Sequence, residues 1–480
     1  MRKNAPDGVI ATPPSHVVRS DRVEHDDSPI SDVLYDSRTL DAYTIGVQAY
    51  VYGWPLVENY RVRSRFLDPA CAQHGALNVF RHETDPAGHG FELFVTPNAD
   101  LLYSGTFFDL TEEPLVLHVP DTGDMRYWTA QILDAFTDTC ANVSSRSVGV
   151  GPGDYALTGP DRPGALPPGV TEVRVPTRTG CILLRTLFES LDDLDATREI
   201  QRRFTLTPLS AYGTGTPQRG VAVPADDPRR AVPADQEELS ASLTFFTVLN
   251  RALTEAGLRH ADEAGLMHLF ARIGVGPGRD LDPGRLDSAT REGLARAVTD
   301  GWKLVQARSM TARTVLLNGW MLSQPDAQTG AYGHDHLQRA GVAHRGIYAN
   351  TETEYVALPG LMDSAGRMLD GNHEYTVRFE ADALPPVAAY WSVTIYSLPD
   401  RRLPDHPAGR VTVNSLDPAL VRGDDGSVEI LVQHGEPEAG LKANWLSAPT
   451  GPFQLILRAY GPTDDTLHSG EWPPPVIERH

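Results

Sequence analysis

The period of the hydrophobic residues switches along this chain, and this switching limits the possible folds more than any other feature. Between about Phe91 and Phe188 the period is close to two, in the segments FELFV, TFFDL, LVLHV, RYWTAQIL and ILLRTLF. Clusters of Pro, Gly and Asp separate these segments, without a connector of helical pattern. The pattern therefore predicts antiparallel strands in a sandwich or barrel.

Apolar residues with helical spacing occur before and after this region. From about Asp41 they recur every three to four positions, at Ala42, Ile45, Ala49, Tyr52 and Leu56. This spacing predicts an amphipathic helix, with a kink where Gly53 and Pro55 fall. A second helical region is predicted from Ala234 to about Thr314, where segments such as QEELSASLTFFTVLNRALTEAG have the same period.

Strand-like alternation returns after about Tyr348. Between Tyr390 and Tyr396, alternate residues face opposite sides, so that Trp391, Val393 and Ile395 share one face. The segment FQLILRAY, which begins at Phe453, alternates in the same way. We therefore predict a second β domain, either a jelly roll or a sandwich.

The chain is too long for a single core, because 480 residues exceed the roughly 100 to 200 residues of an ordinary domain. We predict a mainly β fold with a helical insert, divided into four parts. Residues 1–36 form a disordered arm, since they mix Pro, Asp, Ser and Arg without periodicity. Residues 37–195 hold the first helix and β domain, 196–345 a largely helical domain, and 346–480 the last β domain.

Composition narrows the class of partner and compartment. The chain has 42 Lys+Arg against 63 Asp+Glu, a net charge of −21, which repels nucleic acid and anionic lipid. Its 3 cysteines lack CxxC spacing, so we expect no disulfide framework. No segment approaches the ~20 apolar residues of a membrane span, and no apolar signal-peptide core precedes residue 36. We expect a reduced, cytoplasmic protein that does not bind a membrane.

Several long motifs resemble known bacterial families. The N-terminal ones are AYVYGWPLVENYR, TPNADLLYSGTFFDL, VPDTGDMRYWTAQILDAFTDTCANVSSR and GPGDYAL, which are similar to domain of unknown function family 1254. Segments such as GIYANTETEYVALPGLMDSAGRMLDGNHEYTVRF, LPPVAAYWSVTIYS and NWLSAPTGPFQLILRAYGP resemble family 1214. The resemblance runs from about residue 41 to 478 and implies an N-terminal β-sandwich, a small helical domain and a C-terminal jelly-roll-like domain.

The run TPNADLLY carries the first candidate site. Asn98, Asp100 and Tyr103 follow Pro97, which favours a turn that can project polar side chains outward. An Asp beside a Tyr can act as a general base, and we assign Asp100 and Tyr103 catalytic roles and Asn98 a substrate-binding role. In the alternative interpretation, Asn98 and Asp100 only cap the turn.

A second candidate site lies on the predicted strand RYWTAQILD. Alternation places Trp128 and Asp134 on one face, where an aromatic ring and a carboxylate suit a sugar-like or aromatic ligand. We assign Asp134 a catalytic role and Arg126 and Trp128 substrate-binding roles. In the alternative, Trp128 belongs to the core and Asp134 to a turn.

A third set of candidates joins the helical region to the last β domain. Tyr348, Asn350 and Glu352 occur in GIYANTETEYV, at a junction of the kind where pockets form. We predict that these residues and Trp445 bind substrate; in the alternative interpretation, which the frequent burial of Trp favours, Trp445 packs at the entry to a strand. His334 and His336 have HxH spacing, but spacing alone does not specify a metal site, and we predict none.

No common catalytic signature occurs: GxSxG, GxxxxGK[ST], HExxH and a strand-GxGxxG-helix unit are all missing. Polar residues nevertheless gather in the turn-rich motifs described above. We therefore predict an enzyme without a bound cofactor, of hydrolase, lyase or isomerase type. It would use carboxylate and tyrosine acid–base chemistry on a polar, hydroxylated or aromatic small molecule in a cleft between the β domains. The alternative is a non-catalytic ligand-binding or assembly protein. We also expect a homo-oligomer, since two β domains present edges that need protection.

Overall fold

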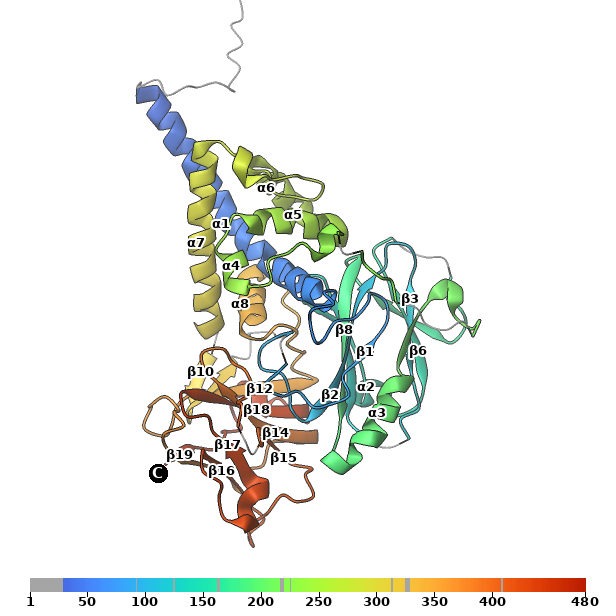
Figure 1. Ribbon diagram of the computed structural model, residues 1–480, viewed down its shortest axis with the longest axis vertical. Coiled ribbons are helices and arrows are strands. Elements are labelled where there is room, and N and C mark those ends of the chain that lie inside the picture. The colour runs from blue at the N-terminus through green and yellow to red at the C-terminus, as the bar shows by residue number, and fades with distance from the viewer. Residues whose placement is uncertain are drawn as a thin grey trace, which may run out of the picture.

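The computed structural model describes residues 29–91, 93–123, 126–161, 165–215, 220–224, 226–311, 314–323, 329–406 and 409–480. Helices hold 32% of the chain and strands 26%, so the fold is mixed. The prediction of a mainly β chain with helical parts is thus met only in part. Figure 1 shows two groups of sheets and, between and above them, a group of helices.

Helix α1 (Pro29–Phe66) is the longest element and begins earlier than the predicted start near Asp41. It continues through Pro55 without interruption. Residues 1–28, most of the predicted arm, lie outside the described residues. The last turns of α1 reach the first group of sheets, where Val62 and Phe66 pack against Phe107 and Leu183.

Helices that follow the N-terminal sheets in the chain pack around α1 (Figure 1). They are α4 (Gln236–Ser240), α5 (Thr244–Ala256), α6 (Ala264–Phe270), α7 (Ser288–Thr311) and α8 (His336–Gly346). The predicted helical region from Ala234 to Thr314 is therefore confirmed in outline. Helices α1 and α7 approach closely because glycines lie between them: a Cβ on Gly293 would lie 2.4 Å from the carbonyl oxygen of Thr39.

Most N-terminal strands lie in the range predicted to hold them, but those at Arg81–His82 and Thr205–Pro208 lie outside it, and the described residues of the predicted strand FELFV form no strand. A five-stranded antiparallel sheet has the order β1 (Arg81–His82), β2 (Leu101–Asp109), β8 (Thr179–Leu187), β4 (Trp128–Asp134) and β5 (Thr139–Ser144). A four-stranded sheet has the order β7 (Val170–Arg174), β6 (Gly153–Thr158), β3 (Leu115–Val119) and β9 (Thr205–Pro208), with β6 and β7 parallel. One core joins the two sheets, in which Leu117, Trp128 and Leu184 are buried together. Short helices α2 (Ser145–Val148) and α3 (Leu194–Arg203) complete this unit.

The C-terminal unit also contains two sheets around one core. The first has the order β10 (Thr314–Leu317), β11 (Trp320–Ser323), β12 (Tyr355–Gly360), β18 (Phe453–Pro462), β14 (Val387–Ser397) and β15 (Thr412–Asn414). The second has the order β17 (Trp445–Ser447), β16 (Val428–Gln433), β13 (Tyr375–Phe379) and β19 (Ile477–Arg479). Helix α9 (Thr466–Ser469) follows β18. Strands β10 and β11 thus join this sheet from within the range predicted to form the helical domain.

The predicted alternation of β14 is confirmed, and both of its faces are buried. Trp391, Val393 and Ile395 lie in the core of the C-terminal unit. On the opposite face, Tyr390 packs with Tyr127 of the N-terminal unit. The second face of β14 is therefore part of an interface between the two units, which explains its tyrosines.

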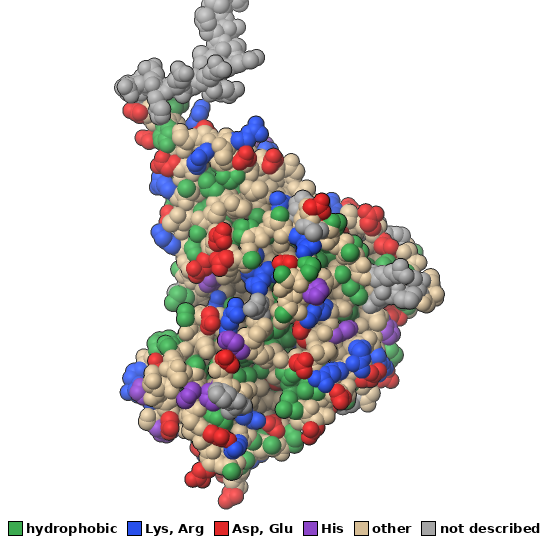
Figure 2. Space-filling model, viewed as in Figure 1, with side chains coloured by type: hydrophobic (Ala, Val, Ile, Leu, Met, Phe, Trp, Pro, Cys, Tyr) green, Lys and Arg blue, Asp and Glu red, His purple; other side chains and the backbone are tan. Residues whose placement is uncertain are grey.

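The surface of the described protein is highly charged, and acidic and basic side chains alternate over the face shown in Figure 2. Among the described residues, no helix has the length and apolar character needed to cross a membrane.

Candidate functional site

A cavity of about 620 Å³ lies where three parts of the chain meet. Its walls come from the N-terminal unit, from helices α4, α7 and α8 with the segment that follows α8, and from the C-terminal sheet, with representative residues Phe94, Tyr103, Ile347, Tyr355 and Ile456. Pockets of this size that form between domains commonly hold small molecules. Four residues predicted to bind substrate line this cavity: Asn98, Tyr348, Asn350 and Glu352. Tyr103, predicted to be catalytic, also lines it.

Three residues of the cavity wall have a left-handed backbone. Thr96, Tyr348 and Arg401 have φ values of 52°, 66° and 56°. Side chains other than glycine rarely adopt this conformation, and it costs on the order of 1 kcal/mol or more at each position. Such strain persists only where surrounding contacts enforce it, and it concentrates at functional sites. The backbone therefore gives support for a site that is independent of the side chains.

Glu352 is the carboxylate of the wall most suited to proton transfer. Burial raises its pKa to about 7, and a hydrogen bond with Thr329 opposes part of this shift. A carboxyl that titrates near neutral pH can both accept and donate a proton under physiological conditions. Asn350 is buried beside it and accepts a hydrogen bond of 2.8 Å from the main-chain N–H of Thr351.

The hydroxyl groups around the cavity are fixed by hydrogen bonds. The Tyr103 hydroxyl accepts a bond of 2.9 Å from the main-chain N–H of Asn98. The Asn98 side chain donates to the Tyr460 hydroxyl, and the Tyr348 hydroxyl donates to Oδ1 of Asn59 at 2.8 Å. Burial raises the pKa of both Tyr103 and Tyr348. These tyrosines are therefore neutral hydrogen-bonding groups at physiological pH.

Asp100 does not line the cavity but lies behind its wall. The side chain is buried near Ser392 and Arg458, in the interface that contains the stacked rings of Tyr390 and Tyr460. Burial raises the pKa of Asp100, while Ser392 and Arg458 oppose the rise. Its position suits a residue that holds Arg458 in place better than one that touches a substrate.

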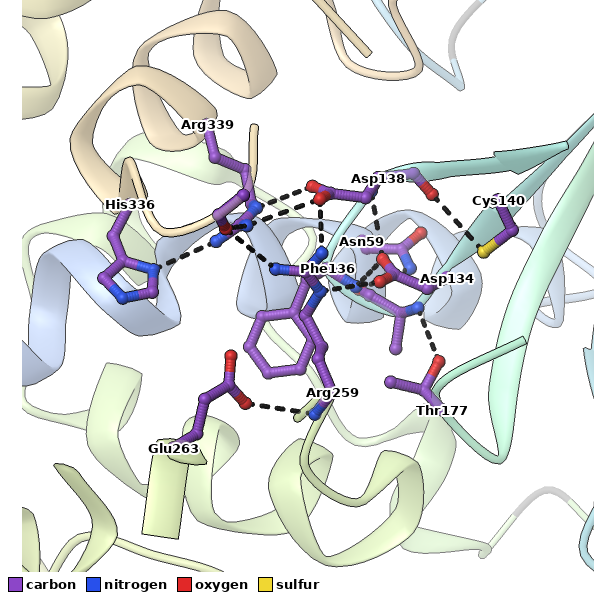
Figure 3. Close-up of polar contacts among 12 residues, drawn as sticks. Asn59, Asp134, Phe136, Asp138, Cys140, Thr177, Arg259, Glu263, His336 and Arg339 are labelled. Atoms are coloured by element: carbon purple, nitrogen blue, oxygen red, sulfur yellow. Dashed lines mark hydrogen bonds and ion pairs between the residues drawn. The ribbon is translucent and has the colours of Figure 1, made fainter. Parts of the chain in front are cut away.

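Asp134 belongs to a separate buried network (Figure 3). Its Oδ2 accepts a hydrogen bond of 2.7 Å from Nε of Arg259, and its Oδ1 accepts bonds from the main-chain N–H groups of Phe136 and Asp138. Asp138 also binds Arg259, and its Oδ1 lies 2.7 Å from Nε of Arg339 in α8. Asp134 therefore has the turn role of the alternative interpretation, and it also joins the N-terminal sheet to the helices.

The other predicted site residues also lie away from the cavity. Trp128 is fully buried in the N-terminal core against Phe204. Arg126 forms a two-pronged ion pair with Asp193. Trp445 donates its ring N–H to the carbonyl of Gln433 at 2.8 Å inside the C-terminal unit. Each of these side chains has a structural partner that accounts for its position.

The alternation predicted for β4 is observed, and the face with Trp128 packs in the core. Trp128 points into the core, whereas Gln131, on the opposite face, points toward the cavity wall. Nε2 of Gln131 donates to the carbonyl of Ala349 at 3.1 Å, and its Oε1 accepts from Nη1 of Arg185 at 2.7 Å.

Sequence reasoning missed four arginines of the wall, Arg185, Arg345, Arg401 and Arg458. Two of them had a detectable signal, because Arg185 and Arg458 are single charges inside the apolar segments ILLRTLF and FQLILRAY. A charge in a buried strand requires a partner or a function. Arg345 and Arg401 lie in polar segments and give no such signal.

The described residues contain no group of three or more His, Cys, Asp or Glu side chains placed to hold a metal ion. The rings of His334 and His336 lie 6.3 Å apart, and Nδ1 of His336 is 3.0 Å from Nη1 of Arg339. Burial, followed by the charge of Arg339, lowers the pKa of His336 to about 4.

Comparison with solved structures supports the fold. The crystal structure of the VPA0106 protein from Vibrio parahaemolyticus is similar, with a TM-score of 0.67 and 24% sequence identity over 92% of this chain and 100% of that chain. A crystal structure of a protein from Burkholderia cenocepacia aligns over 96% of this chain and 91% of that chain, with a TM-score of 0.42 and 13% identity. No curated protein matches the chain.

Family models match both β units. The model described as "Protein of unknown function (DUF1254)" matches residues 77–208, and the model described as "Protein of unknown function (DUF1214)" matches residues 354–464. The matches have the order that the sequence motifs predict, on either side of the helical region. The N-terminal unit is therefore similar to the DUF1254 family and the C-terminal unit to the DUF1214 family.

Proposed function

We propose that this protein is an enzyme that acts on a polar, hydroxylated or aromatic small molecule in the cavity between its two β units. Glu352 is the general acid or base, and Tyr103 and Asn98 orient the substrate. The reaction is of hydrolase, lyase or isomerase type. The observation that carries the proposal is the position of Glu352: a carboxyl whose pKa burial raises to about 7 lies in the wall of a cavity of about 620 Å³.

The assignment differs from the sequence prediction in its choice of carboxylate. Asp134 is held by Arg259 outside the cavity, and Asp100 lies behind the wall. Neither can reach a molecule in the cavity without a rearrangement of buried contacts. Glu352, predicted only to bind substrate, therefore takes the acid–base role.

Other features complete the proposal. The two pairs of sheets form an N-terminal β-sandwich and a C-terminal jelly-roll-like domain, and the protein is cytoplasmic and assembles as a homo-oligomer. The core shared by each pair of sheets supports the assignment of a sandwich and a jelly-roll-like domain. Exposed apolar side chains at the start of α1, Ile30, Val33 and Leu34, are consistent with a contact between subunits.

A depletion screen tests the enzyme against the binding alternative. The wild-type protein and the Glu352→Gln variant are each incubated with a set of hydroxylated and aromatic acids, alcohols and esters, and the compounds are measured by mass spectrometry. We expect at least one compound that the wild type consumes and the variant leaves unchanged. A compound that binds both proteins but is consumed by neither would favour a ligand-binding protein instead.

A further inference from the structure

The charge of the cavity wall is opposite to that of the whole protein. The chain has a net charge of −21, yet the cavity contains four arginines and only two carboxylates, Glu237 and Glu352. Glu237 is exposed, at one edge of the wall. Grouping basic side chains in one concave site of an acidic protein focuses a positive potential there.

Within the described part of the chain, none of the four guanidinium groups forms an ion pair with a carboxylate. Arg185 donates to Gln131 and to the carbonyl of Tyr348, and Arg458 to the Tyr355 hydroxyl and the carbonyl of Thr96. Their hydrogen bonds are thus made to neutral oxygens, while the charge of Asp100 acts on Arg458 and that of Glu58 acts on Arg401.

Arg345 and Arg401 are neighbours in this wall. The Arg345 guanidinium has no hydrogen bond or ion pair with another described residue. Nη1 of Arg401 donates to the carbonyls of His344 and Arg345, at 3.1 and 2.8 Å. Burial lowers the pKa of both arginines, and the charge of Arg345 lowers that of Arg401 further. Arg345 and Arg401 are partly exposed, and neither forms an ion pair with a described carboxylate, so a ligand that supplies negative charge would be stabilised beside them.

We infer that the cavity binds an organic anion, whose carboxylate or phosphate group is held by Arg345 and Arg401. Guanidinium groups bind both oxyanions through paired hydrogen bonds. The body of the ligand packs on the apolar part of the wall, which includes Phe94, Leu183 and Ile456. This inference specifies the substrate class of the proposed enzyme and so rests on the same cavity.

Binding of small probes to the full-length protein tests the inference. Isothermal titration is carried out with benzoate, phenyl phosphate and neutral benzamide, on the wild type and on Arg345→Gln. We expect the variant to lose roughly 10- to 100-fold in affinity for the better anion, the range for a charge-assisted hydrogen bond. Benzamide should bind both proteins equally. Tighter binding of benzoate assigns a carboxylate ligand, and tighter binding of phenyl phosphate assigns a phosphate ester.

Two further variants separate the site from general effects of charge and folding. Arg422→Gln removes one positive charge from an exposed position and should leave anion affinity unchanged. Arg345→Lys keeps the charge and should recover part of the affinity lost in Arg345→Gln, with the same thermal midpoint as the wild type. The inference is overturned if the wild type binds neither anion, or if Arg345→Gln binds both as tightly as the wild type.

The outcome is distinguishable from that of the enzyme proposal. Anion binding that depends on Arg345, without turnover in the depletion screen, would retain the anion site and reject catalysis. Turnover of a neutral compound by the wild type but not by Glu352→Gln, without anion binding, would retain catalysis and reject the anion site.

Discussion

Nη2 of Arg458, in strand β18 of the C-terminal unit, donates a hydrogen bond of 2.9 Å to the main-chain carbonyl of Thr96 in the N-terminal unit. The N–H of the same Thr96 donates to the carbonyl of Arg401 at 3.1 Å. Both polar groups of one strained residue are therefore held by the other unit. These contacts hold the cavity wall in place where the N-terminal unit touches the C-terminal unit.

Replacing Arg458 with Met should destabilise the protein by about 2 to 4 kcal/mol. The substitution preserves apolar bulk but leaves Asp100 and the Thr96 carbonyl buried without their cationic neighbour, and the loss of one member of a buried polar group has a cost of this order. Urea unfolding, followed by circular dichroism, measures the change. An unchanged midpoint would show that the Arg458 contacts do not hold the two units together.

The stability of the wild type relative to Glu352→Gln should fall as the pH rises from about 5 to 8. Burial raises the folded-state pKa of Glu352 to about 7 from the ordinary value of 4.5. Between these values the unfolded chain has released the proton and the folded protein still holds it, so increasing pH favours unfolding. Thermal midpoints of both proteins across this range give the comparison. Parallel curves would contradict the shifted pKa.

The ion-pair network in Figure 3 should be far more sensitive than an ion pair on the surface. Arg339→Ala removes a fully buried cation from Asp138 and should cost about 3 to 5 kcal/mol. Arg378→Ala is the matched control, because Arg378 pairs with Glu380 and Asp425 in an exposed position and should cost under about 1 kcal/mol. Chemical unfolding of both variants distinguishes them. Equal losses would mean that the network makes no special contribution.

Two Gly→Ala substitutions in helices should have opposite effects. At Gly293 a Cβ would lie 2.4 Å from the Thr39 carbonyl oxygen and 2.7 Å from Cβ of Ala42, so Gly293→Ala should push α1 and α7 apart and lower the thermal midpoint. At Gly265 a Cβ meets no atom within 4 Å, so Gly265→Ala should be neutral or stabilise by up to about 1 kcal/mol. Differential scanning calorimetry checks the sign of each change. A stabilised Gly293→Ala variant would contradict the close helix contact.

The sequence predicted local structure better than it predicted the site. Periodicity placed most strands and the middle helices, because a buried face imposes its period on the residues that form it. It could not show that the second face of β14 packs against another unit, since apolar and aromatic residues on both faces also suit an interior strand. Asp134 looked like a catalytic group because its partner Arg259 is 125 positions away in the sequence.

The same limit explains the missed arginines. Arg345 and Arg401 are distant in the sequence, and only the packing of α8 against the C-terminal unit brings them together. Glu352 carried a functional prediction from its place at a junction, but the shift of its pKa depends on burial that no local pattern reveals.

Because three parts of the chain build the cavity, the cavity depends on one gene that encodes all three. A DUF1254 segment encoded alone would carry Asn98 and Arg185 on an open surface, and a DUF1214 segment alone would expose the tyrosines of β14 and β18 to water. Neither product would enclose the cavity, and both would present an apolar area prone to association. A gene fission at the junction near Tyr348 would therefore abolish the site at once, even with every codon of the chain still present in the genome.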